Sequence, residues 1–168
     1  MSDNILVIPK VSIIIPIYNT APFLRETLDS ICNQSLKELD IILINDGSTD
    51  ESPDIIEEYA LRDHRIRYMT QPNQGQSVAR NNGLQLATGK YIYFMDSDDK
   101  LDTDALKECY NICEKDKLDF VFFDATVISA PDTSNTFTYC RKGIINENKL
   151  WNGMELFNYC LLYTSDAA

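Results

Sequence analysis

An apolar run that ends in three acids decides the fold expected for this chain: Tyr91-Ile92-Tyr93-Phe94-Met95-Asp96-Ser97-Asp98-Asp99. A short apolar run bounded by polar residues is typical of a strand buried on both faces, as in parallel α/β sheets. Successive side chains of an extended segment point to opposite sides, so we expect Asp96 and Asp98 to project together. Because ligands of such sheets gather at the carboxyl ends of the strands, the acids mark a candidate binding edge.

The acids themselves have two interpretations. Two nearby carboxylates repel each other unless a cation lies between them, and oxygen ligands suit a hard divalent ion, Mg²⁺ or Mn²⁺. The alternative is a solvated acidic turn that precedes the helix expected from about Thr103.

The rest of the chain alternates apolar runs with helical periodicity. We expect a mostly parallel, doubly wound, Rossmann-like α/β sheet with helices on both faces and right-handed crossovers. The expected strands cover residues 11–16, 39–45, 66–70, 91–95 and 119–127, and the expected helices cover 20–34, 52–62, 77–87 and 103–115. Beyond residue 129 the pattern loosens, with a short strand over 136–139 and a helix over 152–162. The 168 residues suffice for one core, so we expect a single domain.

Composition restricts the partners. The net charge of −11 argues against nucleic acids and anionic membranes as primary partners, because both carry negative charge. The five cysteines show no zinc-like spacing, which indicates reduced thiols. With neither a secretory signal nor a transmembrane segment in the sequence, we expect a cytoplasmic protein, and parts outside this sequence leave room for a peripheral position at the inner face of the membrane.

Three polar groups follow expected strands: Pro16-Ile17-Tyr18-Asn19, Asp46-Gly47-Ser48 and Asp96-Ser97-Asp98. We expect them to meet at one edge of the sheet. In their order along the chain they resemble the motifs of family 2 glycosyltransferases of the GT-A type, inverting enzymes that use nucleotide-diphosphate sugars. The resemblance covers about residues 11–102 and rests on four stretches: Val11-Ser12-Ile13-Ile14-Ile15-Pro16-Ile17-Tyr18-Asn19, Asn45-Asp46-Gly47-Ser48-Thr49-Asp50, Asn73-Gln74-Gly75-Gln76-Ser77-Val78-Ala79-Arg80-Asn81 and Phe94-Met95-Asp96-Ser97-Asp98-Asp99.

The resemblance implies a role for each strand end. It implies that Asp98 binds Mn²⁺ or Mg²⁺, that Asp96 lies near the ribose and nucleotide, and that Asp46 holds a uracil base. For Asp99 two interpretations stay open, a helper of Asp98 at the metal or an acid at the start of the following helix. Tyr18 is expected to border the base. The full set of nucleotide-binding residues that we predict is Pro16, Tyr18, Asn19, Asp46, Arg80, Asp96 and Ser97, with metal ligands Asp98 and Asp96. For Arg80 a second interpretation stays open, a structural salt bridge to Asp46 or Asp96.

The predicted function is transfer of a sugar, from a donor that we expect to be a UDP-sugar, to a hydroxyl of a carbohydrate or lipid-linked acceptor, in polysaccharide or glycan synthesis. Residues 1–128 are expected to form the donor-binding core, and 129–168 the incomplete start of the acceptor side. The catalytic base is unknown, because the family places it beyond the end of this sequence. We therefore expect little or no activity from this chain. Two alternatives are a nucleotidyltransferase and a non-catalytic nucleotide-binding module.

Overall fold

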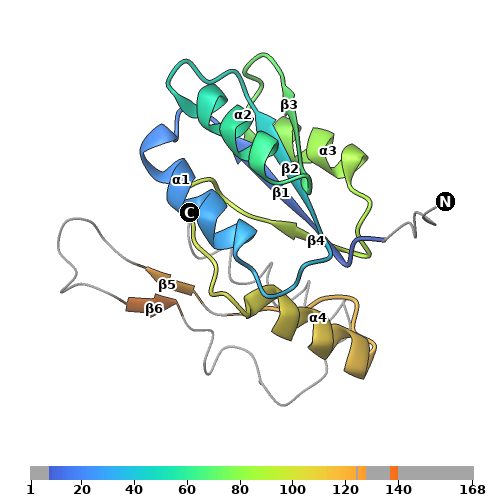
Figure 1. The fold of residues 1–168 in the computed structure, drawn as a ribbon. Helices are drawn as coiled ribbons and strands as arrows, with labels where there is room; N and C mark the ends of the chain where they lie inside the picture. The colour runs from blue at the N-terminus through green and yellow to red at the C-terminus, as the bar shows by residue number, and fades with distance from the viewer. Residues whose placement is uncertain (1–7, 124, 128–136, 140–168) are drawn as a thin grey trace, which may run out of the picture. The chain divides into compact units, whose positions relative to one another are not determined.

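A parallel sheet forms the framework of the first of two units, Met1–Val121 and Phe122–Ala168, in the computed structural model (Figure 1). The structure describes residues 8–123, 125–127 and 137–139. The strand order is β3-β2-β1-β4, and every neighbouring pair is parallel. The strands are β1 (Val11–Ile17), β2 (Leu39–Asn45), β3 (Ile66–Thr70) and β4 (Tyr91–Phe94), and the helices are α1 (Ala21–Cys32), α2 (Ser52–Arg62), α3 (Gln76–Leu86) and α4 (Ala105–Asp116).

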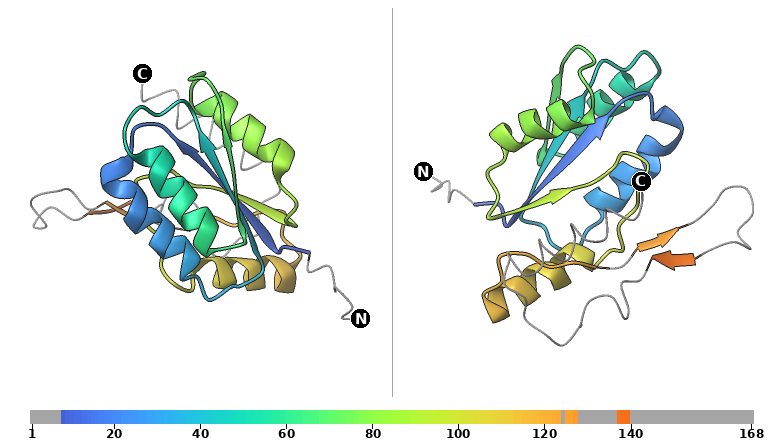
Figure 2. Two further views of the ribbon diagram at one scale, coloured as in Figure 1. Left: turned by 45° about the horizontal axis from the view of Figure 1, so that its top comes forward. Right: turned by 180° about the vertical axis from the view of Figure 1, so that it is seen from behind.

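Helices cover both faces of this sheet, as expected. Figure 2 shows α1 and α2 on one face and α3 on the other. All residues of β1 and β2 are buried, and their side chains alternate between two cores. Ile13 and Ile15 join the core under α1 and α2, whereas Ile14 joins the core under α3. This two-sided burial explains the near-continuous apolar sequences of both strands.

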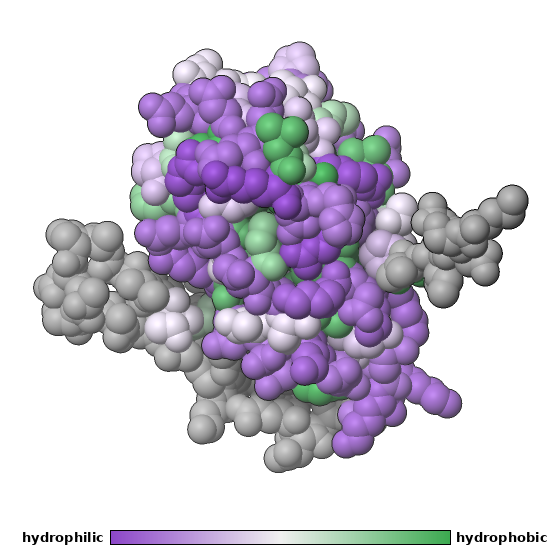
Figure 3. All heavy atoms as spheres, in the orientation of Figure 1, coloured by the Kyte–Doolittle hydropathy of each residue, from purple (hydrophilic) through white to green (hydrophobic). Residues whose placement is uncertain are grey.

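The outward surfaces of α1 and α2 are mostly hydrophilic (Figure 3). Their apolar positions, among them Leu24, Leu28, Ile55 and Ile56, recur at helical spacing and point into the core. None of the described helices is long and apolar enough to cross a membrane.

A buried polar cluster fixes the amino end of the sheet. Asp40 is 5% exposed and accepts hydrogen bonds from Ser12 Oγ, from the Arg67 guanidinium and from Thr88. Burial raises the pKa of Asp40, but these hydrogen bonds outweigh it and hold the pKa below its usual value. Gly89 donates its N–H to Ser12 Oγ at 2.8 Å. The cluster therefore ties the start of β4 to β1 and β2.

Two expectations about strands are wrong. β4 is not buried on both faces: it lies at the edge of the described sheet, and Ile92 and Phe94 are 38% and 44% exposed. The expected strand over 119–127 does not join this sheet. Residues 119–123 form no strand, and only Ala125–Val127 (β5) does, paired antiparallel with β6 (Phe137–Tyr139) in the second unit.

Both predictions were wrong because an apolar run does not specify how many other strands lie beside a strand in the sheet. Phe120, Phe122 and Phe123 are 42% to 50% exposed, which is incompatible with a central parallel strand. The short strand expected at 136–139 is confirmed as β6, and the helix expected over 152–162 lies outside the described residues. The other expected strands and helices are present with ends shifted by at most two residues.

The link between α2 and β3 contains an ion pair that depends on pH. Asp63 and Arg65 are each 15% exposed, and the hydrogen bond from Arg65 lowers the pKa of Asp63 to about 2. Arg65 also donates to the carbonyl oxygen of Cys32 at 2.9 Å, so the pair connects the end of α1 to this link.

We predict that Gly83→Ala destabilises the protein. α3 packs so closely on β1 that a Cβ at Gly83 would lie 2.4 Å from Ile14 Cγ2, and Ile14 is fully buried. The clash should lower the free energy of unfolding by about 1 to 3 kcal/mol, measured by urea denaturation. Gln85→Ala, at an exposed position of the same helix, is the matched control and should be neutral or slightly stabilising. A Gly83→Ala protein as stable as wild type would contradict the close packing.

We also predict an acid-dependent loss of stability from the Asp63–Arg65 pair. A carboxyl whose pKa is lower in the folded state stabilises the protein above the unfolded pKa, and this contribution disappears as the pH falls through the folded pKa. Asp63→Asn should therefore be about 2 kcal/mol less stable than wild type at pH 7, and the difference should vanish between about pH 4 and pH 2. Denaturation at a series of pH values measures this. Asp116→Asn, at an exposed position, is the control and should be about as stable as wild type at pH 7.

Candidate functional site

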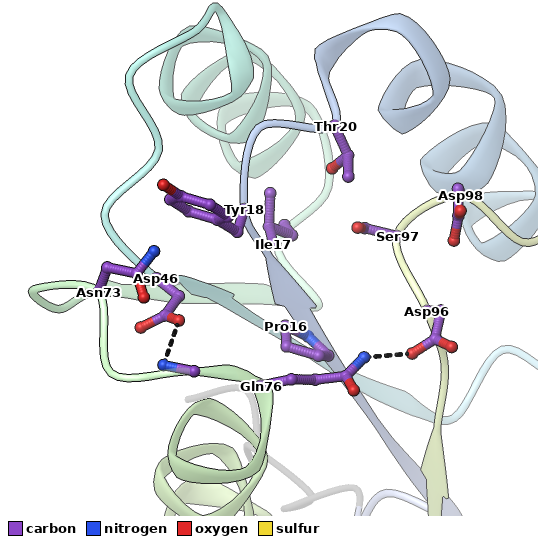
Figure 4. A pocket seen from close by; sticks show the side chains of 11 residues that line it. Pro16, Ile17, Tyr18, Thr20, Asp46, Asn73, Gln76, Asp96, Ser97 and Asp98 are labelled. Carbon is purple, nitrogen blue, oxygen red and sulfur yellow. Dashed lines mark hydrogen bonds between the residues drawn. The ribbon is translucent and has the colours of Figure 1, made fainter.

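A pocket of about 450 Å³ opens at the carboxyl edge of the sheet (Figure 4). Its walls come from the ends of β1 and β2, from the segment before α3 and from the acidic turn after β4. The lining residues are Pro16, Ile17, Tyr18, Thr20, Asp46, Asn73, Gly75, Gln76, Asp96, Ser97 and Asp98. The structure thus brings together the three polar groups that the sequence placed at strand ends.

The pocket exists because β1 and β4 separate before β1 ends. Their pairing stops at Ile14 and Phe94, followed by one hydrogen bond from Met95 N to Ile14 O. The backbone groups at even positions of β1 point toward β4. An N–H at position 16 would therefore point toward a strand that has already turned away. Pro16 lacks this N–H and fits a place where the ladder ends. Beyond it, the β4 chain carries Asp96, Ser97 and Asp98 around the opening (Figure 4).

Asn19 stabilises the loops beside the pocket. Its backbone is left-handed, with φ at 53°, and its Oδ1 accepts a hydrogen bond of 2.8 Å from Thr49 N. Asp50 similarly accepts from Ala21 N and Ser52 N, which joins the starts of α1 and α2. Asn19 is absent from the residues that line the pocket. We expected Asn19 to shape the pocket through its backbone, and its contact with a nucleotide stays a prediction.

Asp46 is buried, with 3% of its surface exposed, although it lines the pocket. Its Oδ1 accepts hydrogen bonds from Gln71 Nε2 at 2.8 Å and Gln74 N at 2.9 Å, and its Oδ2 accepts one from Gly75 N at 2.9 Å. A carboxylate has about four acceptor positions, so one position on Oδ2 remains for a further donor.

The acidic turn places three carboxyl groups close together. Burial raises the pKa of Asp99 above its usual value, and the charges of Asp96 and Asp98 raise it further. Asp96 and Asp98 line the pocket, whereas Asp99 does not. Ser97 is 6% exposed, and its carbonyl oxygen accepts a hydrogen bond from Thr27 Oγ1 at 2.9 Å. This bond attaches the turn to α1 and fixes the backbone between the two acids.

Arg80 forms the salt bridge that was one of its two interpretations. Its Nη2 lies 2.7 Å from Asp96 Oδ1, and the guanidinium lies 6.0 Å from the centre of the Phe94 ring. Arg80 does not line the pocket. Its charge is therefore directed at Asp96, and the contact with a phosphate stays a prediction.

Gln71 and Gln76 donate hydrogen bonds to aspartates of the site, and the sequence by itself indicated no role for either side chain. Gln76 donates from Nε2 to Asp96 Oδ1 at 2.8 Å, and Gln71 donates to Asp46. Gln76 lies within a stretch that carried the family resemblance, but a glutamine before a helix has no chemical signal of its own. Only its position beside Asp96 reveals its role.

The charges of the pocket favour a bound cation. The described residues that line it include three aspartates and no Lys or Arg. A diphosphate would be repelled from such a surface unless a metal ion accompanied it. The described residues contain no group of three or more His, Cys, Asp or Glu suited to a metal. Mg²⁺ is commonly held by one or two carboxylates, with water and substrate phosphates as further ligands, and Asp96 and Asp98 fit that pattern.

The rim of the pocket carries an aromatic side chain at the position expected to border a base. Tyr18 is 50% exposed, and Figure 4 shows its ring on the side of the pocket where Asp46 and Asn73 lie. An exposed aromatic ring beside a pocket is suited to contact a flat ligand group.

Curated relatives match about two thirds of the chain. The uncharacterised glycosyltransferase EpsJ of Bacillus subtilis is 46% identical over 114 residues, which cover 68% of this chain and 33% of EpsJ. The chondroitin synthase of Pasteurella multocida is 41% identical over 110 residues, 66% of this chain and 11% of that enzyme. The chain therefore spans about a third or less of the length of these relatives.

Two solved structures are also similar to this chain. Residues 1–349 of Staphylococcus aureus TarS in complex with UDP-GlcNAc match with a TM-score of 0.60 and 29% identity, covering 63% of this chain and 31% of that one. The mannosyltransferase PcManGT of Pyrobaculum calidifontis, in complex with GDP-Man and Mn²⁺, matches with a TM-score of 0.52 and 29% identity over 55% of this chain and 28% of that one. The model of glycosyl transferase family 2 matches residues 12–166. The chain belongs to glycosyl transferase family 2 and has the GT-A fold.

Proposed function

We propose that the pocket binds a UDP-sugar and that the whole protein transfers the sugar to an acceptor hydroxyl with inversion. The observation that carries the proposal is the arrangement of the pocket in a family 2 chain: Asp46 and Tyr18 lie at one end, and Asp96 and Asp98 lie at the other (Figure 4). One end suits a base and the other a metal-bound diphosphate. The UDP-GlcNAc complex of TarS supports this choice of donor.

At the base end, Asp46 offers the remaining acceptor position of Oδ2 to an N–H of uracil. Its three hydrogen bonds hold the carboxylate in one orientation, so little order is lost when the base binds. Tyr18 borders the ring of the base, and Pro16 forms the floor between the two ends.

At the diphosphate end, Asp98 would bind Mn²⁺ or Mg²⁺ with help from Asp96, which also lies near the ribose. When bound, the metal would stabilise negative charge on the diphosphate that leaves the sugar. Ser97 lies between these acids, and its backbone is attached to α1. The Mn²⁺ in the PcManGT complex supports a metal in the donor site of this fold.

We propose that residues outside this sequence, which spans about a third or less of the relatives named above, bind the acceptor. A base must lie within hydrogen-bond reach of the acceptor hydroxyl, and we propose that it lies outside this sequence. The chondroitin synthase among the relatives supports a role in polysaccharide synthesis, with a carbohydrate or lipid-linked acceptor. Residues 1–128 are proposed as the donor-binding part and 129–168 as the start of the acceptor side. The cytoplasmic location and the inner face of the membrane stay predictions.

We predict that UDP binding requires a divalent metal and Asp98. Isothermal titration calorimetry should show UDP affinity at least tenfold higher with Mn²⁺ than with excess EDTA, because a diphosphate alone is repelled by the aspartates of the pocket. Asp98→Asn should remove most of this difference, whereas Asp54→Asn, at an exposed position on α2, should keep it. Equal affinity for UDP with Mn²⁺ and with EDTA would contradict a metal at this site.

We also predict that UDP binds more tightly than ADP or CDP and that Asp46 is responsible. Asp46→Asn should weaken UDP binding by about 1 to 3 kcal/mol through loss of a charge-assisted hydrogen bond. Because Asp46 also holds the segment before α3, the informative quantity is the ratio of UDP to ADP affinity, measured with Mn²⁺ by calorimetry. The ratio should approach one in the variant. A variant that keeps the wild-type ratio would place base recognition elsewhere.

A further inference from the structure

One short segment touches both ends of the pocket. Residues 71–76, which we call the amide strap, connect the end of β3 to the start of α3. At its first residue, Gln71 N donates to the carbonyl oxygen of Asn45, and Gln71 Oε1 accepts from Asn82 Nδ2 at 2.6 Å. Gln71 is 6% exposed. The strap therefore starts from a buried side chain whose amide nitrogen and oxygen both take part in hydrogen bonds.

Asp46 anchors the middle of the amide strap. Among the described residues, three groups donate to its carboxylate and all belong to the strap: the Gln71 side chain and the backbone N–H groups of Gln74 and Gly75. Hydrogen bonds to a buried charged group are stronger than those between neutral groups, so this anchor restricts the backbone that leads into α3. Gly75 permits the turn, because its φ of 88° is unfavourable for other residues.

The last residue of the strap reaches the opposite end of the pocket. Gln76 Nε2 donates to Asp96 Oδ1 at 2.8 Å, and Arg80, one helical turn later, donates to the same oxygen at 2.7 Å (Figure 4 shows the Gln76 bond). None of the described residues donates a hydrogen bond to Asp96 Oδ2. Two donors on one oxygen fix the rotation of the carboxylate and leave the other oxygen for a ligand.

We propose that Gln76 is a positioning residue that, together with Arg80, orients Asp96 for the metal-diphosphate end of the donor, and that Asp46 sets the place of Gln76 through the amide strap. This inference rests on the proposed donor site and adds to it. Without Gln76, Asp96 keeps only the Arg80 contact, and its carboxylate can turn toward the guanidinium. Asp96 Oδ2 would then be lost as an oriented acceptor.

The test compares Gln76→Ala with Gln74→Ala by calorimetry on the 168-residue chain. Gln74 has the same side chain in the same strap, is exposed, and acts on Asp46 through its backbone N–H, which alanine retains. Gln76→Ala should weaken Mn²⁺-UDP binding by about tenfold and leave the affinity for uridine within about twofold of wild type. Gln74→Ala should leave both affinities within about twofold. A residue that only supports the fold would change both ligands equally.

A double-mutant cycle tests whether Gln76 acts through Asp96. In an Asp96→Ala background, Gln76→Ala should have no further effect on Mn²⁺-UDP affinity, because the group that it orients is gone. An equal effect in both backgrounds, or normal Mn²⁺-UDP binding by Gln76→Ala, would overturn the inference. These failures differ from failure of the proposed function, in which the wild-type chain itself would not bind UDP with Mn²⁺.

Discussion

The separation of β1 from β4 is the constraint on which the site depends. A parallel ladder normally continues as long as both strands offer their N–H and C=O groups. Here the ladder stops at Ile14 and Phe94. Pro16 follows at the next position of β1 where a backbone N–H would point toward β4. The backbone after β4 is then free to turn, and it carries Asp96 and Asp98 to the far side of an opening. Without this separation, the ends of β1 and β4 would lie side by side and no pocket would form between them.

Hydrogen bonds from side chains make the loops around this opening rigid. The β1–α1 and β2–α2 connections are joined through Asn19, Ser48 and Asp50, and Thr27 holds the acidic turn through the carbonyl oxygen of Ser97. The bond from Thr27 to Ser97 is buried, so its loss would leave an unsatisfied partner, whereas the bonds of Asn19 to Ser48 and Thr49 are exposed. Much of the polar sequence that resembles family 2 therefore forms the frame of the site, and a smaller part faces the ligand.

The electrostatics of the pocket follow from the same arrangement. The positive charge of Arg80 is already directed at Asp96, and the lining residues supply negative charge. The carboxylates of such a pocket repel negative charge on a ligand, and a bound cation would reduce this repulsion. The amide strap also connects the two ends of the pocket. Asp46, the carboxylate proposed to bind the base, holds the segment whose Gln76 donates to Asp96.

The sequence by itself determined the framework. The ranges of β2, α2 and β3 agree with the expected residues, because two-sided burial and helical periodicity are local patterns. It also placed Asp46, Asp96 and Asp98 at one edge, because parallel strands align their carboxyl ends. Tertiary structure alone decided that β4 is an edge strand, that residues 119–123 do not extend the sheet, that Asn19 turns to Thr49, and that Gln76 meets Asp96. These features depend on which residues become neighbours after folding, and a periodic pattern along the chain carries no information about those neighbours.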